Sequence, residues 1–314
     1  MSKALTSKSI GQFLLDNAIT IVLLLLVAVF VYNDPSFLSL VNLTNILSQA
    51  STNVIIALGV AGLIVTQGTD LSAGRMVGLS AVVAASLLQS PDNVSRMYQE
   101  LPGILANQYI IVALIVACII TACLGFLNGF VIAKLKVTPF ITTLGSMIII
   151  YGLSSMYVDR EPMGAQPIGG LATHYTEFAQ GGFRIGSLMV PYLVIYATAV
   201  TIFMWVLWNK TRFGKNLFAV GGNPEAAAVS GVNITKTLLI VYTLAGALYG
   251  FAGTLEAARV GSATNNTGNM YELDAIAACV VGGVSFSGGV GKISGVVIGV
   301  LMFQVISYGL NFSG

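Results

Sequence analysis

A short polar stretch, QGTDLSAGR at 67–75, separates two apolar segments and contains side chains suited to chemistry inside a membrane protein. Asp70 or Ser72 can cap the helix that follows. Arg75 can extend toward the membrane surface or pair with Asp70. Because charges at membrane depth tend to be functional, an ion pair near a translocation path is the alternative to a tight turn between helices. Both interpretations remain open at this point.

A second polar stretch, GSATNNTGN at 261–269, is rich in hydrogen-bonding groups. Asn265 and Asn266 have amide donors and acceptors that suit a polar solute or a partner protein. An exposed polar loop explains the same residues equally well. We therefore treat Asn265 and Asn266, with Asp70, Ser72 and Arg75, as candidate residues of a translocation path or gate.

The segment GGNPEAAAVSG at 221–231 has the signals of a complete short helix. Its start and stop residues are a good N-cap, a proline at the first helical position, an acid in the first turn and a closing glycine, namely Asn223, Pro224, Glu225 and Gly231. Ala226 and Ala227 are small and apolar where a solvated helix would carry charges. Because so short a helix is unstable alone, we expect it to dock in a groove on another protein, the alternative being an ordinary connecting loop.

The sequence contains no pattern that predicts catalysis. In GGVSFSGGVGKIS at 282–294, Phe286 occupies the first glycine position of a P-loop, and Ile293 replaces the required Ser or Thr. The single histidine, His174, has no acidic or cysteine cluster at ligand spacing, and no nucleophile–base pair stands out. We therefore expect no enzyme activity, no metal and no cofactor in this chain.

The composition is that of a membrane protein. Charged residues make up 8% of the chain, hydrophobic residues 56%, and the mean hydropathy is +0.87. A soluble domain has roughly 25% charged residues. The net charge of +2 supplies no basic patch, which argues against a nucleic-acid partner and leaves the lipid bilayer as the expected surroundings.

Nine apolar segments predict an all-α polytopic membrane protein with a single transmembrane domain over 1–314. No soluble domain interrupts them, and we expect 159–187 and 209–236 to be loops. The expected spans are 17–33, 51–67, 74–90, 109–133, 139–158, 188–208, 237–257, 273–284 with the Gly-rich sequence after it, and 293–311.

The distribution of Lys and Arg predicts the orientation. With the N-terminus inside, Arg96, Arg160, Arg184 and Arg259 fall outside, and the other ten of the 14 basic residues fall inside. This positive-inside bias places 209–236 in the cytoplasm and 159–187 outside. The ten are Lys3, Lys8, Arg75, Lys134, Lys136, Lys210, Arg212, Lys215, Lys236 and Lys292.

Four Gly-x-x-x-Gly pairs lie in the expected helices, and we expect them to support close helix packing. They are Gly74/Gly78, Gly125/Gly129, Gly246/Gly250 and Gly295/Gly299.

EAAAVSG at 225–231 fits the coupling-loop pattern E-A-A-x-x-x-G, and on this segment the chain resembles permeases of ABC importers. Four longer stretches of the chain resemble the monosaccharide branch of this family, whose permeases have the type II ABC-importer-like fold. These are GLIVTQGTDLSAGR (62–75), VTPFITTLGSMIIIYG (137–152), NKTRFGKNLFAVGGNPEAAAVSGVN (209–233) and ELDAIAACVVGGVSFSGGVG (272–291). The resemblance extends over essentially the whole chain.

The resemblance implies that two permease copies form the membrane part of an importer in the bacterial inner membrane. A periplasmic binding protein delivers a monosaccharide such as galactose, glucose or a methyl-galactoside. Separate ATPase subunits, which bind ATP and Mg²⁺, dock on the coupling residues Asn223, Pro224, Glu225, Ala226, Ala227 and Gly231. Ribose or another small sugar, or a secondary transporter, is the alternative. The family has ten membrane helices, so we also expect one more helix after Gly314.

Overall fold

The structure, a computed structural model, describes residues 17–101, 109–160, 164–186 and 188–313. Helices dominate, with one short hairpin. In chain order the elements are α2 (Ala18–Asn33), η1 (Pro35–Leu38), α3 (Leu40–Val65), α4 (Ala73–Leu87), α5 (Ile110–Leu135), α6 (Pro139–Val158), α7 (Thr173–Gln180), β1 (Gly182–Ile185), β2 (Leu188–Pro191), α8 (Tyr192–Lys210), α9 (Arg212–Gly222), α10 (Pro224–Val229), α11 (Ile234–Val260), α12 (Tyr271–Val281) and α13 (Ile293–Ser313).

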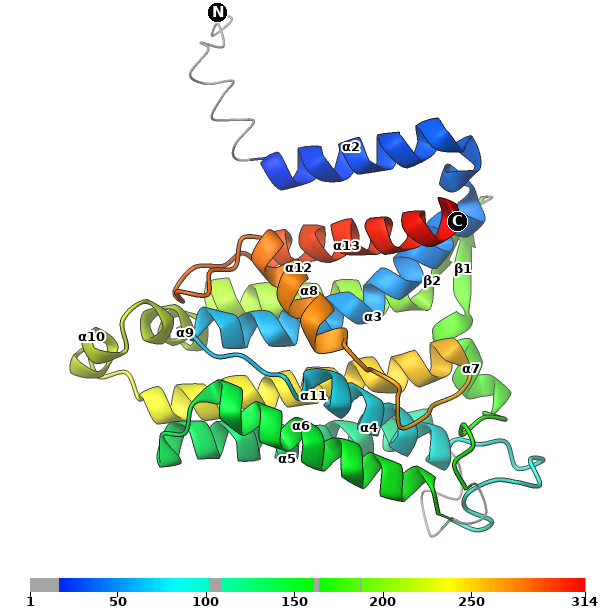
Figure 1. Cartoon of the computed structure of the whole chain (residues 1–314), viewed down its shortest axis with the longest axis horizontal. Helices are drawn as coiled ribbons and strands as arrows, with labels where there is room; N and C mark the ends of the chain where they lie inside the picture. Colours follow the sequence, from blue (N-terminus) through cyan, green and yellow to red (C-terminus); the bar gives the residue numbers. More distant parts are fainter. Residues whose placement is uncertain (1–16, 102–108, 161–163, 187, 314) are drawn as a thin grey trace, which may run out of the picture.

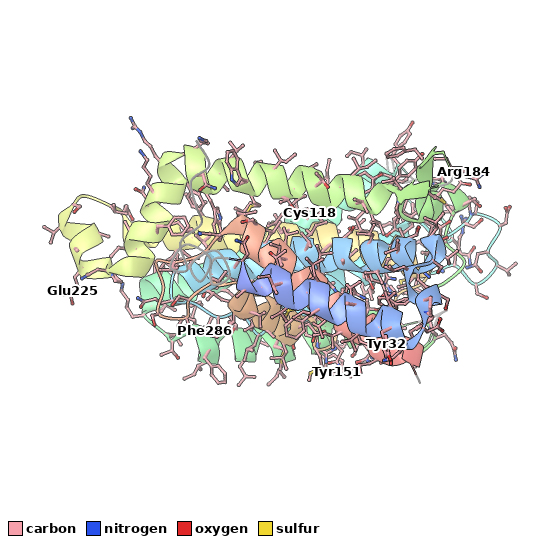
Figure 2. All side chains as sticks on the ribbon, turned by 90° about the horizontal axis from the view of Figure 1, so that it is seen from above. Tyr32, Cys118, Tyr151, Arg184, Glu225 and Phe286 are labelled. Atoms are coloured by element: carbon pink, nitrogen blue, oxygen red, sulfur yellow. The ribbon has the colours of Figure 1, made fainter. Side chains whose placement is uncertain are left out.

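The long helices lie side by side along one axis, and the bundle has two distinct ends (Figure 1). We call them the α10 end, where α9 and α10 lie, and the hairpin end, where the antiparallel strands β1 and β2 lie. Helix α2 begins at the α10 end, and α13 finishes at the hairpin end. Figure 2 shows Glu225 at the tip of the α10 end and Arg184 at the opposite end.

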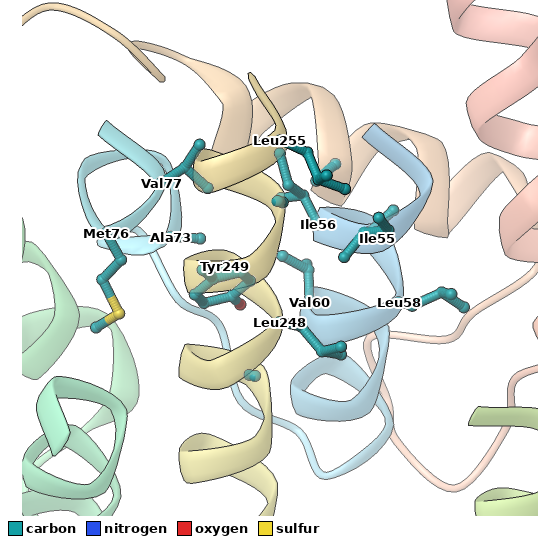
Figure 3. Close-up of a cluster of buried hydrophobic side chains, with 14 of the residues drawn as sticks. Ile55, Ile56, Leu58, Val60, Ala73, Met76, Val77, Leu248, Tyr249 and Leu255 are labelled. Atoms are coloured by element: carbon teal, nitrogen blue, oxygen red, sulfur yellow. The ribbon is translucent and has the colours of Figure 1, made fainter. Parts of the chain in front are cut away.

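Helices α3 and α11 form the centre of the bundle. Of the most apolar 18-residue window in each helix, 83% is buried in α3 and 61% in α11, against 22% in α5, α6 and α8. Figure 3 shows the core where Ile56 and Val60 of α3 lie beside Tyr249 of α11 and Val77 of α4. The outer helices instead expose large apolar side chains, such as Ile149, which lipid rather than water can surround.

Each of the nine predicted spans contains a helix, and among the described residues six helices are long and apolar enough to cross a membrane. The largest boundary difference is at α3, which begins at Leu40 rather than at residue 51. Three of the nine helices are short, and the first of them, α2, has 16 residues. Helix α4 has 15 residues and α12 has 11, so neither crosses by itself. Each follows a non-helical stretch, 66–72 before α4 and 261–270 before α12.

The N-terminal ends of α4 and α12 meet inside the bundle. A Cβ atom on Gly74 would lie 2.3 Å from the carbonyl oxygen of Gly268, and one on Gly78 would lie 2.2 Å from that of Thr267. Backbone therefore touches backbone where the two half-length helices begin. Discontinuous helices of this kind are typical of transporters, where they supply polar backbone near the middle of the membrane.

The expected role in helix packing is confirmed for three of the four glycine pairs, whereas Gly74 and Gly78 pack against the non-helical backbone at 267–268. On the seam between α5 and α11, a Cβ on Gly125 would lie 2.3 Å from the carbonyl oxygen of Tyr242. A Cβ on Gly246 would lie 2.3 Å from that of Thr121, and one on Gly299 would lie 2.1 Å from that of Ala278. Since a real Cβ cannot approach so closely, these glycines set the helix–helix distances.

Both long connections contain more structure than the sequence predicted. Residues 159–187 include α7 and β1, and 209–236 include α9 as well as the expected α10. Helix α9 is amphipathic, with Leu217 and Val220 buried. Its eleven residues are too few to stand out as a span, and its apolar face becomes visible only where it packs against α8, α11 and α3.

Candidate functional site: a polar cavity among α3, α11, α12 and α13

A polar cavity of about 250 Å³ lies among α3, α11, α12 and α13. Small-molecule sites typically have volumes of roughly 300–1,000 Å³, so this cavity suits a small solute. Its apolar end is closed by Ile56, Ala275, Ala278 and Val300. The remaining lining is largely polar, and its main members are Gln49, Thr52, Asn53, Glu256, Arg259, Tyr271, Asp274, Phe303, Gln304 and Ser307.

One wall of the cavity is an ion pair with additional hydrogen bonds. The Glu256 side chain, 2% exposed, accepts from Arg259 through Nη2–Oε1 (2.6 Å) and Nε–Oε2 (2.9 Å). Tyr271 of α12 donates to Oε1 (2.9 Å), and Thr52 of α3 donates to Oε2 (3.1 Å). A buried carboxylate is stable only when its oxygens are paired in this way. The arrangement links α3, α11 and α12 around one charge.

The opposite wall is a chain of three amides. Gln304 of α13 donates to Gln49 (2.6 Å) and accepts from Asn53 (3.2 Å), both on α3. An amide side chain has both donors and an acceptor, so each member can also bind a hydroxyl group. Asp274, at the start of α12, lines the same cavity, and the structure gives its side chain no hydrogen bond among the described residues.

A second cavity, of about 240 Å³, continues toward the hairpin end and shares Gln49 and Arg259 with the first. Thr44, Asn45 and Ser48 of α3 line it. The two cavities are therefore neighbours, and the second lies nearer the hairpin end. Sequence analysis missed this site because it began the helix at residue 51. The sequence feature that could have predicted the site is a polar stripe at helical spacing on α3. It consists of Asn45, Ser48, Gln49, Thr52 and Asn53.

The candidate residues Asp70 and Ser72 lie in a different, solvent-excluded cluster. Asp70 is 1% exposed and accepts from the Ser72 backbone N–H (2.9 Å) and hydroxyl (2.5 Å). Asn128 of α5 donates to the Ser72 oxygen (3.0 Å) and accepts from Ser146 of α6 (2.5 Å). The expected cap of α4 by Ser72 does not form, since its side chain accepts no backbone N–H of that helix.

Of the two alternatives for Arg75, the pairing with Asp70 does not form. Arg75 instead donates to Asn269 Oδ1 (2.6 Å) and lies over the Tyr151 ring at 4.5 Å. The reason is that the first turn of α4 meets the 261–270 stretch, which supplies acceptors for the guanidinium. Since α4 begins inside the bundle, Arg75 also does not lie at the α10 end, where the charge count had placed it (Figure 1).

Asn265 and Asn266 are separated from the cavity described above. Asn265 donates to Ser155 of α6 (3.1 Å), and its carbonyl accepts from Arg75 (3.4 Å). Asn266 is exposed. Four of the five candidate residues of a path therefore lie at the start of α4 or contact it, and none of the five lines the polar cavity.

The predicted start and stop of α10 are confirmed. The Asn223 side chain accepts from the Ala226 N–H (2.9 Å), and Pro224 begins the helix. Gly231 has φ +84°, and the Val232 N–H donates to the Ala227 carbonyl (3.0 Å), so the chain leaves through a left-handed turn. The segment is thus a rigid capped helix at the end of the bundle.

The outward face of α10 differs from the one the sequence predicted. Ala227 is only 4% exposed because it packs against the chain's own α9, so it cannot enter a partner's groove. Ala226 is exposed, as is Glu225, and Val229 is 91% exposed. The exposed face of α10 therefore comprises Glu225, Ala226 and Val229 and leaves out Ala227.

Comparison with known proteins agrees with these features. Residues 42–314 match the family model described as "Branched-chain amino acid transport system / permease component". The chain is 58% identical to the galactose/methyl galactoside import permease protein of Escherichia coli (strain K12), covering 99% of this chain and 91% of the relative. It is 55% identical to the protein of the same name in Haemophilus influenzae, with the same coverage.

The ribose import permease protein of Escherichia coli (strain K12) is 38% identical, over 96% of this chain and 88% of that protein. No solved structure matches the chain. The resemblance noted in 209–233 and 272–291 is thereby confirmed over nearly the full length. The chain belongs to the family of the branched-chain amino acid transport system permease component, as a multi-pass membrane permease.

Proposed function

We propose that this chain is the membrane subunit of an ATP-driven importer in the bacterial inner membrane and that it carries a monosaccharide of the galactose type. The observation that carries the proposal is the polar cavity among α3, α11, α12 and α13. Its amides and carboxylates can donate to and accept from sugar hydroxyls, and Phe303 offers an apolar surface for a ring face. The 58% identity to an import permease for galactose and methyl galactoside supports that choice of sugar.

The exposed tip of α10 supports the part of the proposal in which a separate ATPase subunit binds to this chain. Glu225, Ala226 and Val229 form a small surface on a helix held by an N-cap and a left-handed turn. A rigid helix can transfer motion from a partner's groove to the bundle. In this proposal ATP and Mg²⁺ bind to the partner, the α10 end faces the cytoplasm, and a binding protein delivers sugar to the hairpin end. A second permease copy completes the assembly.

Transport by the reconstituted assembly tests the proposal. The permease is purified with its ATPase subunits, inserted into vesicles, and supplied with the binding protein and radiolabelled galactose. Asn53→Leu removes an amide from the cavity, and we expect uptake to fall about tenfold or more through loss of hydrogen bonds to the sugar. Thr243→Val is the matched control, because within the described residues the Thr243 hydroxyl bonds only to its own helix, at the Leu239 carbonyl (2.7 Å).

Unlabelled sugars added to the same assay identify the substrate. Galactose and methyl galactoside should compete with the label, and ribose should compete weakly. Stronger competition by ribose would assign the permease to the ribose type, which the 38% identical relatives represent. Uptake that continues without ATP and follows an ion gradient would identify a secondary transporter and overturn the proposal.

A further inference from the structure

Three segments that are distant in the sequence meet at one residue, Gln67, at the α10 end. The Gln67 Nε2 group donates to the carbonyl of Gly221 in α9 (2.8 Å) and to that of Ser287 in the 282–292 loop (3.0 Å). Gln67 lies two residues after the end of α3 and has φ +62°, a left-handed conformation that is uncommon for a residue with a side chain. One amide group therefore connects α3, α9 and the loop between α12 and α13.

Backbone contacts surround this amide. The Gly289 N–H donates to the Val65 carbonyl at the end of α3 (2.9 Å). A Cβ on Gly221 would lie 1.8 Å from the Val65 oxygen, and one on Gly288 would lie 2.3 Å from the Gly221 oxygen. No side chain fits between these segments, so they can only move together or separate. This explains the Gly-rich stretch at 282–294, which no nucleotide-binding role accounts for.

The junction lies between the two functional regions. On one side, Gly222 ends α9 and Asn223 caps α10, whose tip is the proposed ATPase surface. On the other side, the 282–292 loop joins α12 to α13, which carry Ala278 and Val300 at the closed end of the polar cavity. The two helices are also tightly joined, since a Cβ on Gly295 would lie 2.0 Å from the Gly282 oxygen.

We infer that Gln67 is the positioning residue that transmits movement of α10 to the closed end of the cavity, through its two hydrogen bonds to Gly221 and Ser287. The inference rests on the proposed function, since it requires a partner that moves α10. When α10 and α9 move, the Gln67 amide moves the 282–292 loop with them. Helices α12 and α13 follow and change the closed end of the cavity. Rigid elements in direct contact are the physical requirement for such coupling.

The experiment distinguishes a role of Gln67 in transmitting the movement of α10 from a role in binding the ATPase subunits. Gln67→Gly removes the amide while keeping the left-handed backbone accessible. In the reconstituted assembly we expect this variant to retain the ATPase subunits and basal ATP hydrolysis. Stimulation of hydrolysis by sugar-loaded binding protein should be lost, and uptake should fall about tenfold, within the usual range of coupling between sites. Asn209→Ala is the control, because the one hydrogen bond that the described part of the chain gives the Asn209 amide lies within α8, to the Trp205 carbonyl (2.9 Å).

Gln67→Asn provides a second variant, because Asn adopts left-handed conformations readily but is too short to reach both carbonyls. It should show a smaller loss in both measurements. Normal stimulation and uptake in Gln67→Gly would overturn the inference, and so would loss of the ATPase subunits, since Gln67 would then only hold the docking surface. If the wild-type assembly itself takes up no monosaccharide, the proposed function fails instead.

Discussion

Arg259 holds Glu256 one turn earlier on α11 with two hydrogen bonds, of 2.6 and 2.9 Å, and it also lines both polar cavities. Glu256 is 2% exposed, whereas the Arg259 side chain is 23% exposed at the boundary between the cavities. The guanidinium therefore has two tasks. It neutralises a carboxylate inside the bundle, and in the proposed function its remaining donors face the solute between the two cavities.

Arg259→Met should destabilise the protein by about 3 kcal/mol, because it leaves a buried carboxylate without its partner. The double variant Glu256→Gln with Arg259→Met should recover most of that loss, since the remaining groups are neutral. Sugar uptake should stay low in both. Thermal unfolding in detergent and uptake in vesicles measure the two effects. Full recovery of uptake in the double variant would show that the pair serves folding alone.

Gly246→Ala should destabilise the bundle by about 1–3 kcal/mol through overpacking, because the new Cβ would meet the Thr121 carbonyl of α5. Gly145→Ala on α6 is the matched control, since nothing lies within 4 Å of the Cβ position there. It should be neutral or slightly stabilising, as Ala favours helix over Gly. Thermal unfolding of both variants in the same detergent is the measurement. Equal effects would argue against a tight α5–α11 seam.

Val229→Arg should reduce copurification of the ATPase subunits, because a long charged side chain would have to enter an apolar groove. Val94→Arg is the control, since Val94 is equally exposed (90% against 91%) but lies near the hairpin end. Copurification is compared at matched membrane expression. Should both variants retain the ATPase equally, α10 is not the docking surface. Ala227→Arg is a poorer probe because it disrupts the packing of α10 on α9.

Gly231→Val should weaken the coupling of sugar uptake to ATP hydrolysis without lowering the stability of the helical bundle. A left-handed conformation costs a residue with a side chain about 1–2 kcal/mol, more when it is β-branched. The surroundings are open, with nothing within 4 Å of the Cβ position, so the effect is purely conformational. Gly231→Asn, which tolerates this backbone, should behave almost as wild type. Hydrogen exchange over 224–231 reports the turn, and unchanged protection in the Val variant would contradict the expectation.

Single cysteines test the orientation. In a background with Cys118, Cys123 and Cys279 replaced by Ala, an impermeant thiol reagent added to spheroplasts should label Thr173→Cys and spare Ser230→Cys. Both positions are exposed, at the hairpin end and the α10 end respectively. The expectation follows from the excess of Lys and Arg toward the α10 end. The reverse labelling pattern would invert the topology.

Local patterns determined much of this protein. Apolar segments of about 20 residues predict helices because each must satisfy its own backbone hydrogen bonds in lipid. Each of the nine segments contains a helix in the described part of the chain, but α2, α4 and α12 have fewer than 18 residues. The sequence also predicted the N-cap at Asn223 and the turn at Gly231, because helix caps depend only on neighbouring residues. The glycine pairs indicated close packing, and the motifs in 209–291 indicated the family.

Tertiary structure alone decided the site. Asp70 and Arg75 are five positions apart, yet they find different partners, because 261–270 reaches the start of α4 and offers Arg75 an acceptor at Asn269. Ala227 was expected to face a partner and is instead covered by α9. The polar cavity combines Gln49 with Gln304, more than 250 positions apart. No local pattern specifies such a contact, since it depends on how four helices pack around one another.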